Sequence, residues 1–269
     1  MLKTILITGS TDGIGLETAK MLVARGHRVL LHGRNPTKLK TVERTLAALP
    51  GKGDFESYVA DFSDMANVAS LAQAVSERHA RLDVLINNAG VYHASRGTTA
   101  AGLDVRFAVN AIAPYLLTNR LLPLLSSSGR VINLSSAAQS PVSLQALTGQ
   151  VGLSEGAAYA QSKLALTMWS CNLGNALMEK GPFIIAVNPG SLLGSKMVKE
   201  AFGIVGGDIR IGAEILVRAA LADEFAAASG QYFDNDSGQF AAPHPDALNA
   251  QKVQAVIRTI ETILADVRG

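Results

Sequence analysis

Charged residues and cysteine are scarce in this chain of 269 residues. Asp, Glu, Lys and Arg together make up 17% of the sequence, and the formal net charge is only +2. No run of Lys or Arg is dense, which argues against a nucleic-acid partner or binding to an anionic membrane. The single cysteine, Cys171, excludes an internal disulfide and suits a reducing compartment.

Long apolar runs are also missing. No segment approaches the roughly 20 unbroken apolar residues of a membrane span. At the N-terminus, the apolar stretch Met1–Thr8 leads straight into a glycine turn, which leaves no room for a secretory signal. We therefore expect a cytoplasmic protein without a membrane partner. No metal site is expected either, because the histidines are scattered without ligand spacing such as HExxH: His27, His32, His79, His93 and His244.

Short apolar runs alternate with helix-period segments almost from end to end. The expected strands are Thr4–Ile7, His27–Leu31, Phe55–Val59, Val84–Asn87, Arg130–Leu134 and Phe183–Asn188. The expected helices are Gly15–Arg25, Thr37–Leu49, Asn67–His79, Ala157–Lys180 and, after an irregular segment at Pro243–Asp246, Ala247–Val267. Ser126–Gly129 is interpreted as a turn. The alternation predicts the α/β class, a single-domain Rossmann fold over 1–269 with a doubly wound parallel sheet and helices on both faces.

A glycine-rich turn joins the first strand to the first helix. Gly9 permits a tight turn, while Gly13 and Gly15 let a phosphate and the helix approach closely. The helix N-terminus would offer N–H groups to a pyrophosphate, although a purely structural turn is the alternative. No Lys-Ser or Lys-Thr follows, so the turn is not a mononucleotide P-loop. The expected cofactor contacts here are Gly9, Ser10, Thr11, Asp12, Gly13, Ile14 and Gly15.

The end of the second strand indicates which dinucleotide is bound. A carboxylate there would favour NAD, but the strand runs into Gly33, Arg34 and Asn35. The planar guanidinium of Arg34 suits a 2′-phosphate, and a solvated surface arginine is the alternative. We expect NADP(H) rather than NAD(H), held by Arg34 and Asn35. Further contacts are expected after the third and fourth strands: Asp61, Phe62, Asn88, Ala89 and Gly90.

A tyrosine and a lysine four residues apart are the first candidates for chemistry. Tyr159 and Lys163 share one face of an expected helix. A tyrosine normally titrates near pH 10, and a neighbouring ammonium, with the nicotinamide charge, would draw this pKa down towards neutrality. The spacing alone is weak, because such pairs arise by chance. Ser135 and Ser136 end the fifth strand, and Asn110 lies on the preceding helix; taken alone, each is better explained as an ordinary polar residue than as a catalytic one.

Taken together and in this order, these residues resemble the short-chain dehydrogenase/reductase family over almost the whole chain. The shared pattern comprises Thr8–Gly15, Asn87–Gly90, Asn110, Ser136, Tyr159, Lys163 and Pro189-Gly190. The resemblance implies that Tyr159 exchanges a proton with the substrate oxygen and that Ser136 bonds the same oxygen. Ser136 is preferred to Ser135 because the hydroxyl just before Ala137-Ala138 matches the family position.

The resemblance assigns supporting roles as well. Lys163 would hold the nicotinamide ribose and lower the pKa of Tyr159, and Asn110 would anchor a water. Pro189, Gly190 and Leu192 would contact the cofactor. Gly194 stands where the family usually has threonine, which leaves open whether Ser195 supplies that hydroxyl.

Two features resemble the retinol-dehydrogenase-like and oxidoreductase-domain branch of the family: the long interval between Ser136 and Tyr159, and the motif Gly230–Phe233. The predicted function is hydride transfer between NADP(H) and a carbonyl or alcohol. A substrate loop at about 139–156 and a glycine-containing lid at about 191–212 predict an apolar or aromatic aldehyde or ketone. A catalytically inactive NADP(H)-binding regulator is the alternative, and a homodimer or homotetramer is compatible with the sequence.

Overall fold

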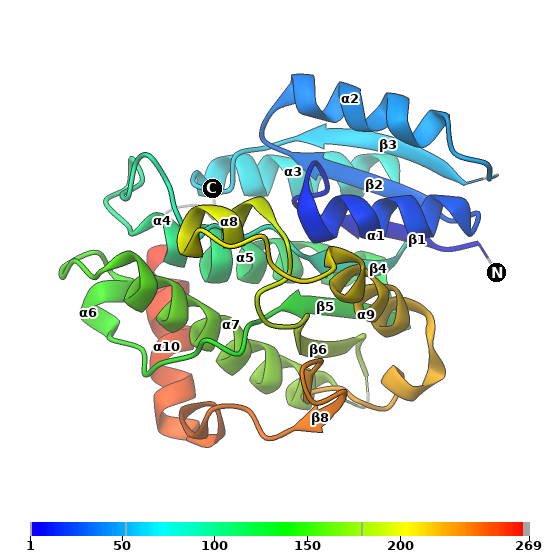
Figure 1. Cartoon of the computed structure of the whole chain (residues 1–269). Coiled ribbons are helices and arrows are strands. Elements are labelled where there is room, and N and C mark those ends of the chain that lie inside the picture. The colour runs from blue at the N-terminus through cyan, green and yellow to red at the C-terminus, as the bar shows by residue number, and fades with distance from the viewer. Residues whose placement is uncertain (1, 52, 179, 266–269) are drawn as a thin grey trace.

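The computed structural model describes residues 2–51, 53–178 and 180–265. Its centre is an eight-stranded sheet in the order β3-β2-β1-β4-β5-β6-β7-β8 (Figure 1). The strands are β1 (Thr4–Ile7), β2 (Arg28–Gly33), β3 (Asp54–Val59), β4 (Leu82–Asn87), β5 (Leu125–Leu134), β6 (Phe183–Asn188), β7 (Tyr232–Asp234) and β8 (Gln239–Ala241). All neighbouring pairs are parallel except β7 and β8. The strand order reverses between β1 and β4, where a ligand cleft is expected above the carboxyl ends.

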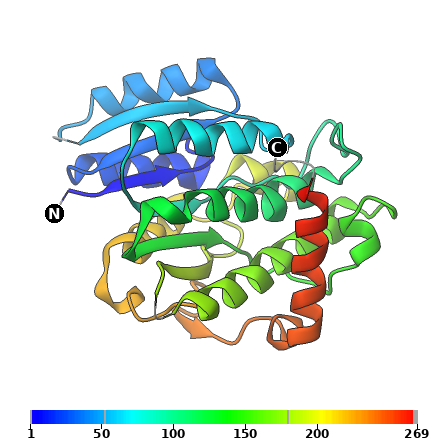
Figure 2. The same cartoon turned by 180° about the vertical axis from the view of Figure 1, so that it is seen from behind.

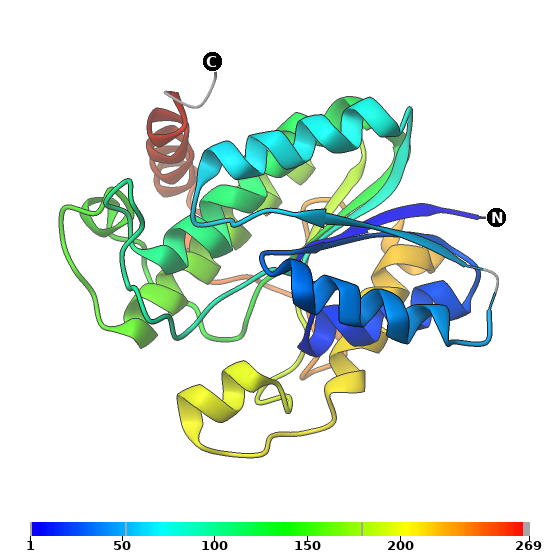
Figure 3. The same cartoon turned by 90° about the horizontal axis from the view of Figure 1, so that it is seen from above.

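Helices cover both faces of the sheet (Figures 2 and 3). One face carries α1 (Gly13–Ala24), α2 (Pro36–Ala47) and α9 (Ile209–Leu221), and the other carries α3 (Met65–Arg78), α5 (Ala113–Leu121) and α7 (Glu155–Leu177). On β1, Ile5 and Ile7 pack into the first layer and Leu6 into the second, so the strand is apolar throughout. The last helix, α10 (Ala250–Ile263), packs outside α7. None of the described helices is both long and apolar enough to span a bilayer.

The predicted doubly wound fold is confirmed, and each of the six expected strands overlaps an observed one. The structure adds α9, β7 and β8. The two strands have three residues each, which is too short to give a periodic pattern in the sequence. The turn predicted at Ser126–Gly129 is wrong. These residues belong to β5. The pairing of β5 with β4 shifts register there, so the backbone is irregular but remains part of the sheet.

The final helix also differs from its predicted bounds. A 3₁₀ turn at Pro245–Leu248 precedes it, and α10 begins at Ala250 with Asn249 as its N-cap. The predicted end at Val267 lies outside the described residues. The long helix predicted to reach Lys180 ends at Leu177.

Candidate active site

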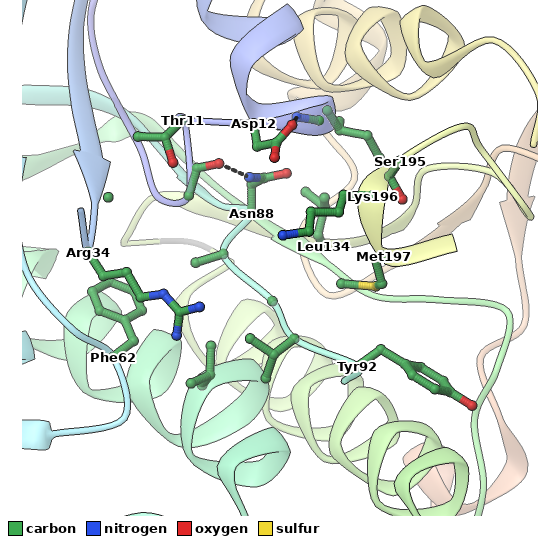
Figure 4. Close-up of a pocket in the computed structure, with 18 of the residues that line it drawn as sticks. Thr11, Asp12, Arg34, Phe62, Asn88, Tyr92, Leu134, Ser195, Lys196 and Met197 are labelled. Carbon is green, nitrogen blue, oxygen red and sulfur yellow. Dashed lines mark hydrogen bonds between the residues drawn. The ribbon is translucent and has the colours of Figure 1, made fainter. Parts of the chain in front are cut away.

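A cavity of about 450 Å³ lies above the carboxyl ends of the central strands. Figure 4 shows Arg34 and Phe62 together at one side of it and Tyr92 at the other, with Thr11 and Asp12 of the glycine turn above. Ser195, Lys196 and Met197 close it from the segment that forms α8 (Lys196–Phe202). This volume falls in the range of small-molecule and cofactor sites, which is roughly 300–1,000 Å³.

The glycine turn is pressed against the end of β4, which explains why it contains glycine. Gly9 has a φ of +67°, and a Cβ there would lie 2.8 Å from the Cα of Ala89. Asn88 fixes the contact, since its Nδ2 donates to the carbonyls of Thr8 at 2.8 Å and Gly9 at 3.0 Å. Helix α1 then begins at Gly13, so its N-terminus borders the cavity. The positive end of a helix favours an anionic group such as a pyrophosphate.

His32 supports this turn from behind. The Gly9 N–H donates to Nδ1 at 3.1 Å, and Nε2 lies 3.0 Å from the carbonyl of Ala60, so the neutral ring carries its proton on Nε2. The ring stacks on Phe62 with centroids 4.2 Å apart. Burial lowers the pKa of His32 to about 4, against smaller opposing effects of the Ala60 bond and Asp61. His32 is thus a satisfied buried histidine that also lines the cavity.

Cationic side chains gather at the Arg34 side of the cavity. Arg34 is exposed there, and Lys38 on α2 lines the same wall with its Nζ 3.9 Å from Oδ2 of Asp12. Asn35 caps α2 by accepting from Thr37 N at 2.9 Å. The sequence reasoning missed Lys38; its position four residues after Arg34, in the first turn of a helix, was the available signal.

Tyr159 and Lys163 line the other end of the cavity together with Ser135, and Ser136 lies beside Tyr159 without lining it. Lys163 is 5% exposed, and its Nζ donates to the carbonyl of Leu134 at 2.7 Å and lies 5.7 Å from the Tyr159 ring centroid. The Ser136 side chain lies close enough to Tyr159 to lower the pKa of the phenol, and Ser136 Oγ accepts from Ala138 N at 3.1 Å. Ser135 instead turns into the core, where its Oγ lies 2.6 Å from Oγ1 of Thr167. The geometry therefore favours Ser136 over Ser135.

Burial dominates the protonation of this pair in the chain by itself, and the lowering of the Tyr159 pKa expected from Lys163 together with the nicotinamide charge stays a prediction. Burial raises the pKa of Tyr159 above its ordinary value, and the Ser136 hydrogen bond only partly opposes this. Burial also lowers the pKa of Lys163 to about 8. The ammonium gives its hydrogen bond to Leu134 rather than to the phenol, so desolvation dominates both groups.

Asn110 lies beneath the same end of the cavity, in a π-helical turn at Ala108–Ile112 that follows α4 (Val105–Phe107). Its Oδ1 accepts from Val91 N at 2.8 Å, and its Nδ2 donates to Val91 O and to Ser162 Oγ, both at 3.0 Å. A Cβ at Gly90 would lie 3.5 Å from Asn110 Oδ1 and 3.6 Å from Lys163 Nζ. The glycine therefore lets the backbone pass close to both groups. Isolated π-helical turns are frequent at functional sites.

Most of the predicted cofactor residues line the cavity: Gly9, Thr11, Asp12, Gly13, Ile14, Arg34, Asn35, Asp61, Phe62, Asn88, Ala89, Gly90, Tyr159, Lys163 and Pro189. Four others do not. Ser10 is buried and bonds the backbone of His32, and Gly15 packs against Gly9 O and Asn88. Gly190 faces Leu193, and Leu192 is half-exposed. These four therefore lie behind or beside the cavity wall.

The two predicted substrate segments behave differently. Residues 139–156 contribute nothing to the lining of this cavity, and Ala146 and Leu147 are buried in the core. The segment 191–212 does close it, and its base is tied by Gly194 N donating to Gly207 O at 2.7 Å. Ser195 caps α8 by accepting from Val198 N at 3.2 Å, and it lies beside Gly13 of the glycine turn.

A cavity bordered by a glycine turn and a helix N-terminus, with Tyr159 and Lys163 at one end, is the arrangement expected of a dinucleotide-dependent oxidoreductase. A family model described as short chain dehydrogenase matches residues 3–203, and the chain belongs to this family. Retinol dehydrogenase 13 of Homo sapiens is 31% identical over 264 residues, covering 91% of this chain and 79% of the relative. Retinol dehydrogenase 12 of Bos taurus is 32% identical over 254 residues, covering 90% of this chain and 80% of the relative. The chain is thus similar to the retinol-dehydrogenase-like branch.

Solved structures agree with this membership. A protein from Mycobacterium paratuberculosis superposes with a TM-score of 0.80 at 27% identity, over 97% of this chain and 92% of its own. RhlG of Pseudomonas aeruginosa, in an active-site complex with NADP, has a TM-score of 0.71 at 27% identity, over 88% of this chain and 95% of its own. A short chain dehydrogenase from Burkholderia cenocepacia in complex with NADP has a TM-score of 0.70 at 25% identity, over 88% of this chain and 97% of its own.

Proposed function

We propose that this protein transfers a hydride between NADP(H) and an apolar or aromatic aldehyde or ketone, or the corresponding alcohol. The observation that carries the proposal is one cavity with Tyr159 and Lys163 in its lining at one end, Ser136 beside Tyr159, and Arg34 at the other end. A merely structural cleft would need neither a tyrosine that can donate a proton nor a cation that can bind a phosphate. NADP in the complexes of the structural relatives supports the choice of cofactor.

The residues present fit such a cofactor. The turn Thr11–Ile14 borders the cavity at a helix N-terminus, and any side chain at Gly9 would collide with Ala89, so backbone alone lies there. Arg34 and Lys38 would hold the 2′-phosphate, and Asp61 and Phe62 the adenine. A further group, Asn88, Ala89, Gly90 and Pro189, would lie along the ribose and nicotinamide. When bound, the nicotinamide ring supplies or accepts the hydride.

Side chains of the protein donate and accept the proton. Tyr159 donates its phenolic proton to the carbonyl oxygen in reduction, or takes the hydroxyl proton in oxidation. Ser136 bonds the same oxygen and steadies its developing charge. The raised pKa keeps Tyr159 protonated before the reaction, and Ser136, which lowers this pKa, stabilises the phenolate that forms when the proton leaves. Lys163 would hold the nicotinamide ribose, and Asn110, which secures Val91, would anchor a water leading from Lys163.

The substrate preference follows from the wall at the Tyr159 end. Tyr92 lies there with its ring centroid 5.0 Å from that of Tyr159, and the lining includes the apolar side chains of Leu134 and Met197. An aromatic or aliphatic carbonyl compound would bury apolar surface against this wall, whereas a sugar would leave hydroxyls without partners. The lid at 191–212 would cover the bound substrate, and residues 139–156 would border its outer side.

NADPH oxidation at 340 nm with matched carbonyl compounds tests the proposal. Acetophenone and longer aryl ketones are compared with polar carbonyl compounds of equal size. We expect kcat/KM to be higher for the apolar series and kcat to fall about 10²-fold or more in Tyr159→Phe. NADPH binding by calorimetry without turnover of any compound would instead identify a regulator. A preference for the polar series would refute the substrate class but leave the chemistry intact.

A further inference from the structure

The short β7–β8 hairpin, far along the chain, reaches the catalytic end of the sheet. Tyr232 on β7 is only 6% exposed, and its hydroxyl donates to the backbone carbonyl of Ser136 at 3.3 Å, across 96 residues of sequence. The same carbonyl accepts from Nε2 of Gln139 at 2.8 Å. The backbone of Ser136 is therefore held from two directions.

The hydroxyl of Tyr232 is presented by a rigid support. Tyr232 is paired with Ala186 on β6 and Ala241 on β8. The next residue, Phe233, is 2% exposed and packs with Phe225 and Phe240 at centroid distances of 5.1 Å. A strand anchored in the sheet and in an aromatic cluster cannot follow small movements of the loop after β5.

The hairpin also secures the chain beyond β6. Asn188 Nδ2 donates to Asp234 Oδ1 at 2.8 Å and to Asp236 Oδ2 at 2.9 Å, and Ser191 N donates to Asp236 Oδ1 at 2.8 Å. The carboxyl ends of β5 and β6 are thus tied to one element. Pro189 in this region lines the cavity, so the hairpin sets the spacing between the two walls at the catalytic end.

We infer that Tyr232 is a positioning residue that holds Ser136 in hydrogen-bonding contact with Tyr159. The inference rests on the proposed function, because Ser136 matters only if Tyr159 transfers a proton. Tyr232 contacts neither the cavity nor Tyr159 through its hydroxyl, so its effect must pass through the Ser136 backbone. Burial raises the pKa of Tyr232 well above that of free tyrosine, so its hydroxyl remains a donor throughout the working pH range.

Tyr232→Phe keeps the ring and removes only the hydroxyl. We expect kcat to fall about fivefold, the factor that corresponds to the net contribution of one neutral hydrogen bond, while the Kd for NADPH is unchanged. Tyr58→Phe is the matched control: its hydroxyl donates to Glu56 at 3.1 Å on β3, away from the cavity. That variant should retain the parental kcat.

A Ser136→Ala background separates positioning from general stability. If Tyr232 acts through Ser136, Tyr232→Phe should cause no further loss of kcat in that background. An equal loss in both backgrounds, or no loss in the parent, would overturn the inference. Circular dichroism melting of each variant shows whether the fold is intact.

A second readout does not depend on turnover. Tyrosine labelled with ¹³C at Cζ reports hydrogen bonding of each phenol by NMR, and the Tyr159 signal is identified by its loss in Tyr159→Phe. Tyr232→Phe should move this signal in the same direction as Ser136→Ala does; an unmoved signal would contradict the inference. If the parent turned over no carbonyl compound, the proposed function would fail while this spectrum still decided the role of Tyr232.

Discussion

Acidification should destabilise the protein through His32. The buried ring accepts a hydrogen bond from Gly9 N–H on Nδ1, and protonation would place a second proton against that donor. The pKa of His32 is lowered by burial from 6.5 to about 4. Because the unfolded chain binds this proton more readily, stability is complete above pH 6.5 and falls as the pH drops towards 4.

The magnitude follows from the size of that change in pKa. A difference of one pKa unit corresponds to about 1.36 kcal/mol, so the full loss for His32, from 6.5 to about 4, is about 3 kcal/mol. At pH 5 the unfolded state is almost fully protonated at this residue and the folded state is not, which leaves a loss of about 2 kcal/mol. The loss weakens the glycine turn directly, since Gly9 is the residue that His32 holds.

Urea unfolding at pH 7.5 and pH 5 measures this effect, with His32→Gln as the comparison. Glutamine can accept from Gly9 N–H without titrating, so the change in unfolding free energy between the two pH values should shrink by about 2 kcal/mol in the variant. His27, whose pKa burial also lowers, contributes with the same sign in both proteins and cancels. An identical pH dependence in parent and variant would refute the reasoning.

Four further outcomes are expected. Arg34→Ala should remove most of the preference for NADPH over NADH, about 1–3 kcal/mol for charge-assisted bonds, in parallel Kd measurements; equal affinities in the parent would disprove the role. Tyr159→Phe should lower kcat about 10²-fold or more and leave the Kd for NADPH nearly unchanged, measured under saturating substrate. Lys163→Ala should weaken NADPH binding and kcat together, and an effect on only one would contradict its double role. Gly9→Ala should abolish NADPH binding in calorimetry, because the new Cβ would lie 2.8 Å from Ala89 Cα at a φ of +67°.

Local spacing was enough to predict the main parts of the fold and site. The apolar runs predicted six of the strands, because strands buried on both faces have near-continuous apolar sequence. The turn from Gly9 to Gly13 and the pair Tyr159 and Lys163 were recognisable because a turn and one helical face are set by neighbours in sequence. Their order along the chain indicated the family, and the family model over residues 3–203 agrees.

Orientation and desolvation were decided only by the tertiary structure. Ser10 belongs to the glycine turn in sequence, yet its side chain bonds His32 on the next strand. In the chain by itself the pKa of Tyr159 is raised, because packing removes water from the phenol. Ser136 is held by Tyr232, 96 residues away. Such contacts join segments that are distant in the chain, so the sequence by itself determined which groups are present and the packing decided which of them meet.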